Sequence, residues 1–160
     1  MIVILMGVAG VGKTTVGRLL ATQLGWEFAD ADAYHSPQNI EKMAAGIPLS
    51  DADRRPWLGT LRQAIESWVA NNKNVVLACS ALKQSYRDLL AVSASVKFVY
   101  LSGTFALIDK RLRQRAGHYM HNDMLESQLA ALEEPASTPT VDVSATPDAI
   151  VREIRHQLKL

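Results

Sequence analysis

One segment constrains this chain more than any other: GVAGVGKTT, which runs from Gly7 to Thr15. It satisfies the pattern G-x-x-x-x-G-K-[ST] and follows an apolar run, Ile2 to Met6, that predicts a buried strand. Its glycines allow backbone torsions and a close approach that a Cβ would obstruct, so the N–H groups can surround a phosphate. A glycine-rich turn matching by chance is the alternative, but the helix-period run from Lys13 to Leu24 also fits the motif. We therefore predict a phosphate-binding loop made of Gly7, Val8, Ala9, Gly10, Val11, Gly12, Lys13, Thr14 and Thr15.

Two side chains of this loop carry specific chemistry. Lys13 is expected to reach the β- and γ-phosphates of a nucleotide as a compact positive charge. The hydroxyl of Thr14 is expected to ligate Mg²⁺. The cofactors predicted from the loop are therefore ATP and Mg²⁺.

Composition excludes several other classes of protein. The chain has 160 residues, of which 48% are hydrophobic, and its 17 basic and 16 acidic residues nearly balance. We expect neither a nucleic-acid nor a membrane partner, because no large field of one sign arises and no apolar run reaches the roughly 18 to 20 residues that span a bilayer. Cys79 is the only cysteine and lies in an apolar context, which favours a buried structural thiol. A soluble, cytoplasmic protein is expected.

Short apolar runs alternate with amphipathic ones along the chain. This alternation predicts an α/β fold with a parallel sheet of about five strands flanked by helices, in a single domain spanning residues 1–160. The expected strands are Ile2–Met6, Trp26–Ala29, Asn74–Ala78, Val96–Leu101 and, more weakly, Thr140–Val143. The expected helices are Lys13–Leu24, Pro37–Ala45, one opened by a capping box at Ser50 and Asp53 and ending near Ala70, Leu82–Leu90, one from Thr104 to Arg115, Met124–Glu133, and one opened by Thr146 and Pro147.

The loop alone does not separate kinases from GTPase switches or motor ATPases. The guanine signature N-K-x-D and a D-x-x-G switch are both missing, and motors usually need a larger domain. A compact small-molecule kinase with a three-layer P-loop fold fits best. Asp30 and Asp32 follow the second strand, where ligands gather in open parallel sheets. One would support Mg²⁺ through water while the other accepts the hydroxyl proton of the acceptor, although two solvated turn aspartates are the simpler alternative.

A kinase must also keep water from the transferred phosphoryl group. Arg111, Arg113 and Arg115 lie near the end of a predicted helix, at the start of a polar stretch that we predict to be a mobile lid over about residues 113–125. At least one of these arginines is expected to meet the phosphates. The alternative is a solvated helix end whose cations meet the negative end of the helix dipole. Contacts with adenine are expected from the lid helix and from residues 144–147.

A group of basic residues in the middle of the chain points to an anionic acceptor. Near the carboxyl edge of the predicted sheet lie Arg54, Lys83 and Arg87. The guanidinium group of arginine can form two parallel hydrogen bonds with one carboxylate or phosphate. The alternative is that Arg54 and Arg87 only pair with nearby aspartates. Met43, Trp57 and Trp68 are expected to be core or dimer contacts.

The sequence resembles the gluconate kinase family. The matching segments occur in family order and cover most of the chain from Met1 to Pro135: GVAGVGKTT, DADAYH, HSPQNIEKMAAGIPLSDADRRPWL, CSALKQSYRDLL, RLRQRAGHYM and MLESQLAALEEP. The resemblance implies ATP:D-gluconate 6-phosphotransferase activity, a nucleoside-kinase-like fold with a moving lid, and a homodimer. Two departures are Ala31, where the family commonly has glycine, and His121, where proline is frequent.

The resemblance also implies roles for individual residues. Asp32 is the expected base and Arg115 the lid cation, while Asp30 supports Mg²⁺. Those expected near gluconate are Asp32, His35, Arg54, Lys83, Arg87 and His118; those expected at the nucleotide include Arg111. His35 and His118 either bind a sugar hydroxyl or pack and cap. A shikimate kinase and a nucleotide-binding regulator without catalysis remain the alternatives.

Overall fold

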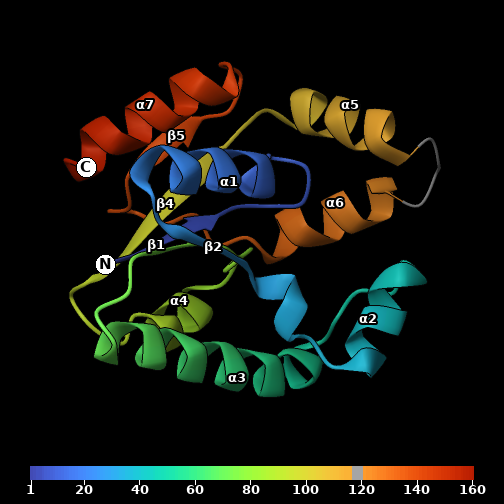
Figure 1. Cartoon of the computed structure of the whole chain (residues 1–160). Coiled ribbons are helices and arrows are strands. Elements are labelled where there is room, and N and C mark those ends of the chain that lie inside the picture. The colour runs from blue at the N-terminus through green and yellow to red at the C-terminus, as the bar shows by residue number, and fades with distance from the viewer. Residues whose placement is uncertain (117–120) are drawn as a thin grey trace.

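The computed structural model describes residues 1–116 and 121–160, which form a sheet between two layers of helices (Figure 1). The five strands pair in the order β2-β3-β1-β4-β5, and every pair is parallel. The strands are β1 (Ile2–Met6), β2 (Glu27–Asp30), β3 (Val75–Ala78), β4 (Val96–Ser102) and β5 (Thr140–Asp142). The helices are α1 (Lys13–Leu24), the 3-10 helix η1 (Ala31–Tyr34), α2 (Pro37–Ala44), α3 (Asp51–Ala70), α4 (Gln84–Leu90), α5 (Phe105–Ala116), α6 (His121–Ala131) and α7 (Pro147–Leu158).

The central strand β1 shows why this sequence forms a three-layer structure. All of its residues are fully buried, as expected for a strand covered on both faces. Val3 and Leu5 belong to the core that contains residues of α1 and α7. Ile4, on the opposite face, belongs to the second core, with Leu61 of α3. Figure 1 shows α1 and α7 on one side of the sheet and α3 and α4 on the other.

The predicted α/β fold with a five-stranded parallel sheet is confirmed. The capping box at the start of α3 is also present, because the Ser50 hydroxyl accepts from the Asp53 N–H and the Asp53 carboxylate accepts from the Ser50 N–H. The helix η1 was not predicted. It forms because the Asp30 carboxylate accepts a hydrogen bond from the Asp32 N–H at 3.0 Å, which folds the chain into a turn directly after β2.

Two further helix boundaries differ from the sequence expectation. α6 begins at His121 rather than Met124, and α4 begins at Gln84 because Lys83 still has an extended backbone. Both differences lie at the carboxyl edge of the sheet. There the loop after β1, the helix η1 and the segment after β3 come together, and α2 and α6 stand beyond them (Figure 1). In the described part of the chain, no helix has both the length and the apolarity to cross a membrane.

Candidate active site

The glycine-rich loop between β1 and α1 forms the floor of the site. Gly10 and Gly12 have φ values of 85° and 101°, which glycine adopts without strain. A Cβ on Gly10 would lie 2.7 Å from Cγ of Leu112, whereas one on Gly12 would meet nothing within 4 Å. The loop therefore packs on α5 at Gly10 and opens to a free space at Gly12, beside the start of α1. An anion fits that position, where the N-terminus of a helix presents unpaired N–H groups.

Lys13 bridges this loop. Its ammonium group donates to the carbonyl oxygens of Gly7 at 2.9 Å and Val8 at 3.0 Å. Burial lowers the pKa of Lys13 and the Arg115 guanidinium acts in the same direction, while the Asp32, Cys79 and Asp30 groups oppose the shift. Lys13 thus lies within electrostatic reach of Asp30, Asp32 and Arg115. A phosphate bound at the loop would give this ammonium group a partner of opposite charge.

Asp30 and Asp32 lie at the end of β2 with different partners. The Thr14 hydroxyl donates to the Asp30 carboxylate at 3.3 Å. The hydroxyl of the motif and this carboxylate therefore lie side by side. The Asp32 side chain is 74% exposed and projects into the cleft. Although this side chain remains accessible to solvent, the walls of the cleft limit its hydration. This partial loss of hydration and the neighbouring Asp30 charge raise the pKa of Asp32, against the opposing effects of Lys13 and His35.

The wall beside Asp32 is built from aromatic rings. His35 stacks on Trp57, with ring centroids 4.3 Å apart and planes inclined by 14°. Trp57 is fixed in turn, because its indole N–H donates to the Ala31 carbonyl at 2.7 Å. The His35 Nε2 lies 4.0 Å from Oδ1 of Asp32. Trp57 is buried in the core, as the sequence suggested, and it also lines the site and holds His35.

The three basic residues expected near the acceptor have different environments. Arg54 lines the cleft and lies over the Tyr86 ring at 5.9 Å. Lys83 pairs with the Asp51 carboxylate at 2.9 Å, and the Tyr86 hydroxyl donates to that same carboxylate. Lys83 does not itself line the cleft; it lies beside Tyr86, which does.

Arg87 is placed away from the cleft. Its side chain is buried, and the guanidinium donates to the carbonyls of Ala81 at 2.9 Å, Leu82 at 3.0 Å and Glu133 at 2.8 Å. These contacts tie the segment after β3 to the chain that follows α6. Because its donors face backbone carbonyls, Arg87 supports the wall of the site and does not line it. The sequence placed it near the acceptor because the helix position alone could not show which way the side chain turns.

Together these residues enclose a cleft of about 570 Å³. It extends from the phosphate loop to Arg54 and is bounded by α2 and α6.

A second cavity of about 260 Å³ lies on the other side of the loop, between α1, α5 and the start of α7. Arg115 lines both cavities, and Arg111 lines the second together with Ala145 and Pro147. The Arg111 guanidinium donates to the Val143 carbonyl at 2.6 Å. His118 lies outside the described residues.

Two contributors to the site were not found from the sequence. The Gln128 side-chain oxygen, on α6, accepts from the Ala9 N–H of the phosphate loop at 2.6 Å. Asn39, on α2, is buried and contacts His35. Glutamine and asparagine carry no distinctive pattern, although Asn39 lies within the long family segment. In the structure it is the buried residue of a helix whose other residues are exposed or half-buried. Cys79 also lines the cleft and is buried, as predicted; burial raises the pKa of its thiol to about 12.

Comparison with known proteins agrees with this geometry. A family model described as shikimate kinase matches residues 9–159. The gluconokinase of Gluconobacter oxydans (strain 621H) is 45% identical over 96% of this chain and 89% of its own length. The thermoresistant gluconokinase of Escherichia coli (strain K12) is 43% identical over 99% of this chain and 93% of its own. The crystal structure of a gluconokinase from Sinorhizobium meliloti 1021 superposes with a TM-score of 0.88 at 42% identity, covering 98% of this chain and 90% of that one.

Proposed function

The chain belongs to the gluconokinase family, within the shikimate-kinase-like P-loop kinases, and we propose that it transfers the γ-phosphoryl group of ATP to the 6-hydroxyl of D-gluconate. One observation of the structure carries the proposal beyond the resemblance. A single cleft holds the loop cation Lys13, the carboxylate of Asp32 and the guanidinium of Arg54. Phosphoryl transfer to an anionic alcohol needs a phosphate anchor, a proton acceptor and a cation for the substrate carboxylate.

The nucleotide would lie along the phosphate loop. The loop N–H groups and Lys13 bind the phosphates, and the second cavity, beside Ala145 and Pro147, receives the base. Arg111 and Arg115 border that cavity and so would meet the phosphate chain. Arg115 also faces the acceptor cleft, where it would stabilise charge on the transferred group. The lid over about residues 113–125 would close over this arrangement.

Mg²⁺ fits beside Thr14 and Asp30. Hydroxyl and carboxylate oxygens are the ligands that this hard cation prefers, and the two groups lie 3.3 Å apart. Among the side chains that the structure describes, those of residues 1–115 and 124–160, no three acidic, histidine or cysteine groups form a metal cluster. Mg²⁺ commonly binds with few protein ligands, taking the rest from water and substrate phosphates, so this donor set suits it. When bound, the ion neutralises the negative charge that develops during transfer.

The acceptor would lie between η1, α2 and α3. Asp32 takes the proton from the attacking hydroxyl, and its raised pKa makes the carboxylate a better proton acceptor than an ordinary aspartate. His35 and Arg54 would bind the remaining hydroxyls and the carboxylate of gluconate. Lys83 and Arg87 contribute through the wall that they support, and His118 from the lid is proposed on resemblance alone.

The assay that tests this function uses purified protein, ATP and Mg²⁺ with gluconate, other sugar acids, shikimate and nucleoside monophosphates. We expect turnover of gluconate to exceed that of the other acceptors. Turnover of shikimate with none of gluconate would overturn the substrate assignment. ATP binding without transfer to any acceptor would favour a nucleotide-binding regulator, against which the presence of Asp32 and Arg115 at the cleft already argues.

We also propose that residues 1–160 act as one catalytic unit, that this unit forms a homodimer, and that it works in the cytoplasm. The family resemblance supports the dimer, which the molar mass in solution will test. The need for ATP supports the location. No nucleic-acid or membrane partner is proposed.

A further inference from the structure

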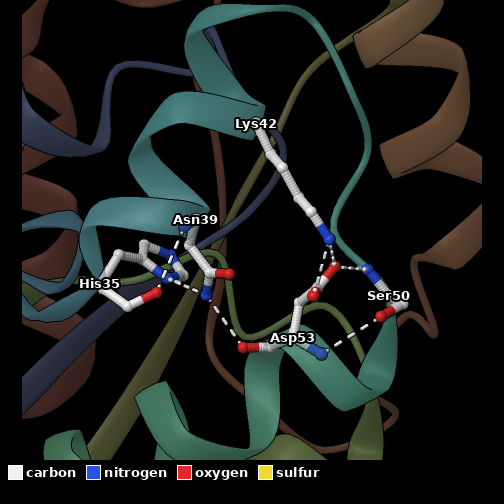
Figure 2. A network of polar contacts seen from close by, with 6 residues as sticks. His35, Asn39, Lys42, Ser50 and Asp53 are labelled. Carbon is white, nitrogen blue, oxygen red and sulfur yellow. Dashed lines mark hydrogen bonds and ion pairs between the residues drawn. The ribbon is translucent and has the colours of Figure 1, made fainter.

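Asn39 is a buried polar residue on α2 whose side-chain nitrogen contacts His35 and Asp53, on the acceptor side of the cleft. Its side chain is almost fully enclosed, the whole residue being 5% exposed. The side-chain nitrogen lies 2.8 Å from the Asp53 carbonyl oxygen and 3.3 Å from Nδ1 of His35 (Figure 2). One amide group thus joins the start of α3 to the imidazole beside Asp32.

The Asp53 carbonyl determines which way this amide faces. A carbonyl oxygen only accepts hydrogen bonds, so the nitrogen of Asn39, not its oxygen, must face Asp53. The two hydrogens of that nitrogen can then serve both neighbours, one to the carbonyl and one to His35. Nδ1 of His35 must therefore present a lone pair, which places the ring proton on Nε2.

Asp53 is itself well anchored. Its carboxylate accepts from the Lys42 ammonium at 2.9 Å and from the Ser50 N–H at 2.9 Å (Figure 2). These contacts and the capping box hold the first turn of α3 against α2. Because Asp53 cannot easily rotate, the direction of its carbonyl, and so the direction of the Asn39 amide, is set by the fold.

The consequence appears at the opposite side of the imidazole. Nε2 lies 4.0 Å from Oδ1 of Asp32, too far for a direct hydrogen bond. An oxygen atom on the cleft side of the two, at about 2.8 Å from each, would bridge them. It could give its proton to Asp32 while it accepts a hydrogen bond from Nε2–H. This is the arrangement that a hydroxyl about to attack a phosphoryl group requires.

We propose that Asn39 is a positioning residue that fixes His35 as the Nε2–H tautomer, so that His35 orients the acceptor hydroxyl toward Asp32. The inference rests on the proposed function for the identity of the acceptor, but not for the tautomer. Asn39 acts through His35 and does not itself line the cleft. Trp57 fixes the plane of the ring by stacking, and Asn39 fixes which nitrogen carries the proton.

The charges around His35 are compatible with a neutral ring. Burial lowers the pKa of His35, the Asp32 carboxylate on η1 raises it and the Arg54 guanidinium on α3 lowers it. On the α2 side, the NH₂ group of Asn39 faces Nδ1 of the ring. Since this group donates a hydrogen bond to Nδ1, it disfavours the addition of a second proton there. A neutral His35 near pH 7 therefore follows from the contacts on all three elements.

The first experiment needs no substrate. In protein with ¹⁵N-labelled histidine, two-bond ¹⁵N–¹H correlation spectra distinguish the protonated ring nitrogen from the unprotonated one. A His35→Gln variant identifies the His35 signals among the four histidines. We expect a proton on Nε2 and none on Nδ1 at pH 7. A proton on Nδ1 would overturn the inference while leaving the kinase assignment untouched.

The second experiment separates positioning from a merely structural role. Asn39→Leu removes both hydrogen-bond donors at similar volume, whereas Lys42→Met breaks only the other link between α2 and α3. Asn39→Leu should raise KM for gluconate at least about tenfold, with little change in KM for ATP, because the orienting hydrogen bond is lost. Lys42→Met should change KM for gluconate by less than about threefold, since a partly exposed ion pair contributes little. Equal effects of the two variants would show that Asn39 only holds the helices together.

A third variant reverses the polarity of the contact. Asn39→Asp places a carboxylate beside Nδ1, which favours a proton there, and so should raise the pKa of His35 by about one unit or more. The same spectra recorded against pH measure this shift. An unchanged His35 pKa in a folded Asn39→Asp protein would contradict the proposal.

Discussion

The Gln128 side-chain oxygen accepts a hydrogen bond of 2.6 Å from the Ala9 N–H. Ala9 belongs to the phosphate loop, and Gln128 to α6, whose first residues fall within the proposed lid. An N–H group that is expected to bind phosphate is therefore held by an amide oxygen from α6. This contact links the two sides of the cleft, and the nucleotide must either tolerate it or displace it.

A change of charge at Gln128 should weaken nucleotide binding. Gln128→Glu places a carboxylate against the loop, where it repels phosphate, so the Kd for a nonhydrolysable ATP analogue should rise about tenfold. Gln128→Ala frees the same N–H and should bind the analogue at least as tightly as the parent protein. Titration calorimetry of both variants measures the difference. Equal affinities would mean that the Ala9 N–H plays no part in binding phosphate.

Removal of the proposed base should separate chemistry from binding. Asp32→Ala should lower kcat by a factor of about 10² to 10⁴ while ATP binds almost normally, because Asp32 faces the acceptor rather than the nucleotide. Single-turnover kinetics and analogue titration measure the two effects. Transfer near the parent rate would show that another group accepts the proton.

The raised pKa of Asp32 also predicts a pH dependence. The base must be ionised to accept a proton, and its folded-state pKa lies above the ordinary value of 3.8. The rate should therefore fall as the pH drops through this raised pKa, so that the acid limb of the kcat/KM profile, which reports on the free enzyme, lies above pH 3.8. Asp32→Ala should lose this limb along with the activity.

Arg115 and Arg113 form a matched pair at the end of α5. Arg115 lines both cavities, whereas Arg113, whose side chain is exposed, pairs with the half-buried Asp109 at 2.9 Å. Arg115→Ala should lower kcat by about 10²-fold or more, because a cation beside the transferred group stabilises the transition state. Arg113→Ala should change it little. An effect of Arg115→Ala on ATP affinity alone would make it a binding residue.

The layers of the fold were predictable because burial imposes periodicity on the sequence. The fully apolar run Ile2–Met6 and the helical spacing of Leu61 and Ile65 each contain enough information to assign an element. The site was predictable where residue type is tied to a motif, as at Lys13. It was not predictable where a residue's role depends on a contact made across the fold. Asn39 shows this limit, because its role depends on the carbonyl of Asp53, 14 residues away along the chain.

Arg87 tests the same limit experimentally. Because its guanidinium serves three backbone carbonyls, Arg87→Met should lower the free energy of unfolding by about 2–4 kcal/mol and leave KM for gluconate nearly unchanged in the folded protein. Lys83→Met, which breaks a more exposed pair with Asp51, should lower the stability clearly less than Arg87→Met does. Urea denaturation compares the two. A large rise in KM for gluconate with normal stability would place Arg87 at the acceptor instead.

The buried thiol of Cys79 should report on opening of the cleft. Burial raises its pKa to about 12 from an ordinary value of 9.0, so at pH 8 it stays protonated and unreactive in the folded protein. Because the folded-state pKa is the higher one, the thiol favours folding fully below pH 9 and loses this contribution as the pH rises toward 12. A disulfide reagent should therefore react with Cys79 at pH 8 only as fast as the protein opens, and bound ATP analogue should slow the reaction by stabilising the closed state. Rapid reaction in the absence of denaturant would contradict the burial on which this prediction depends.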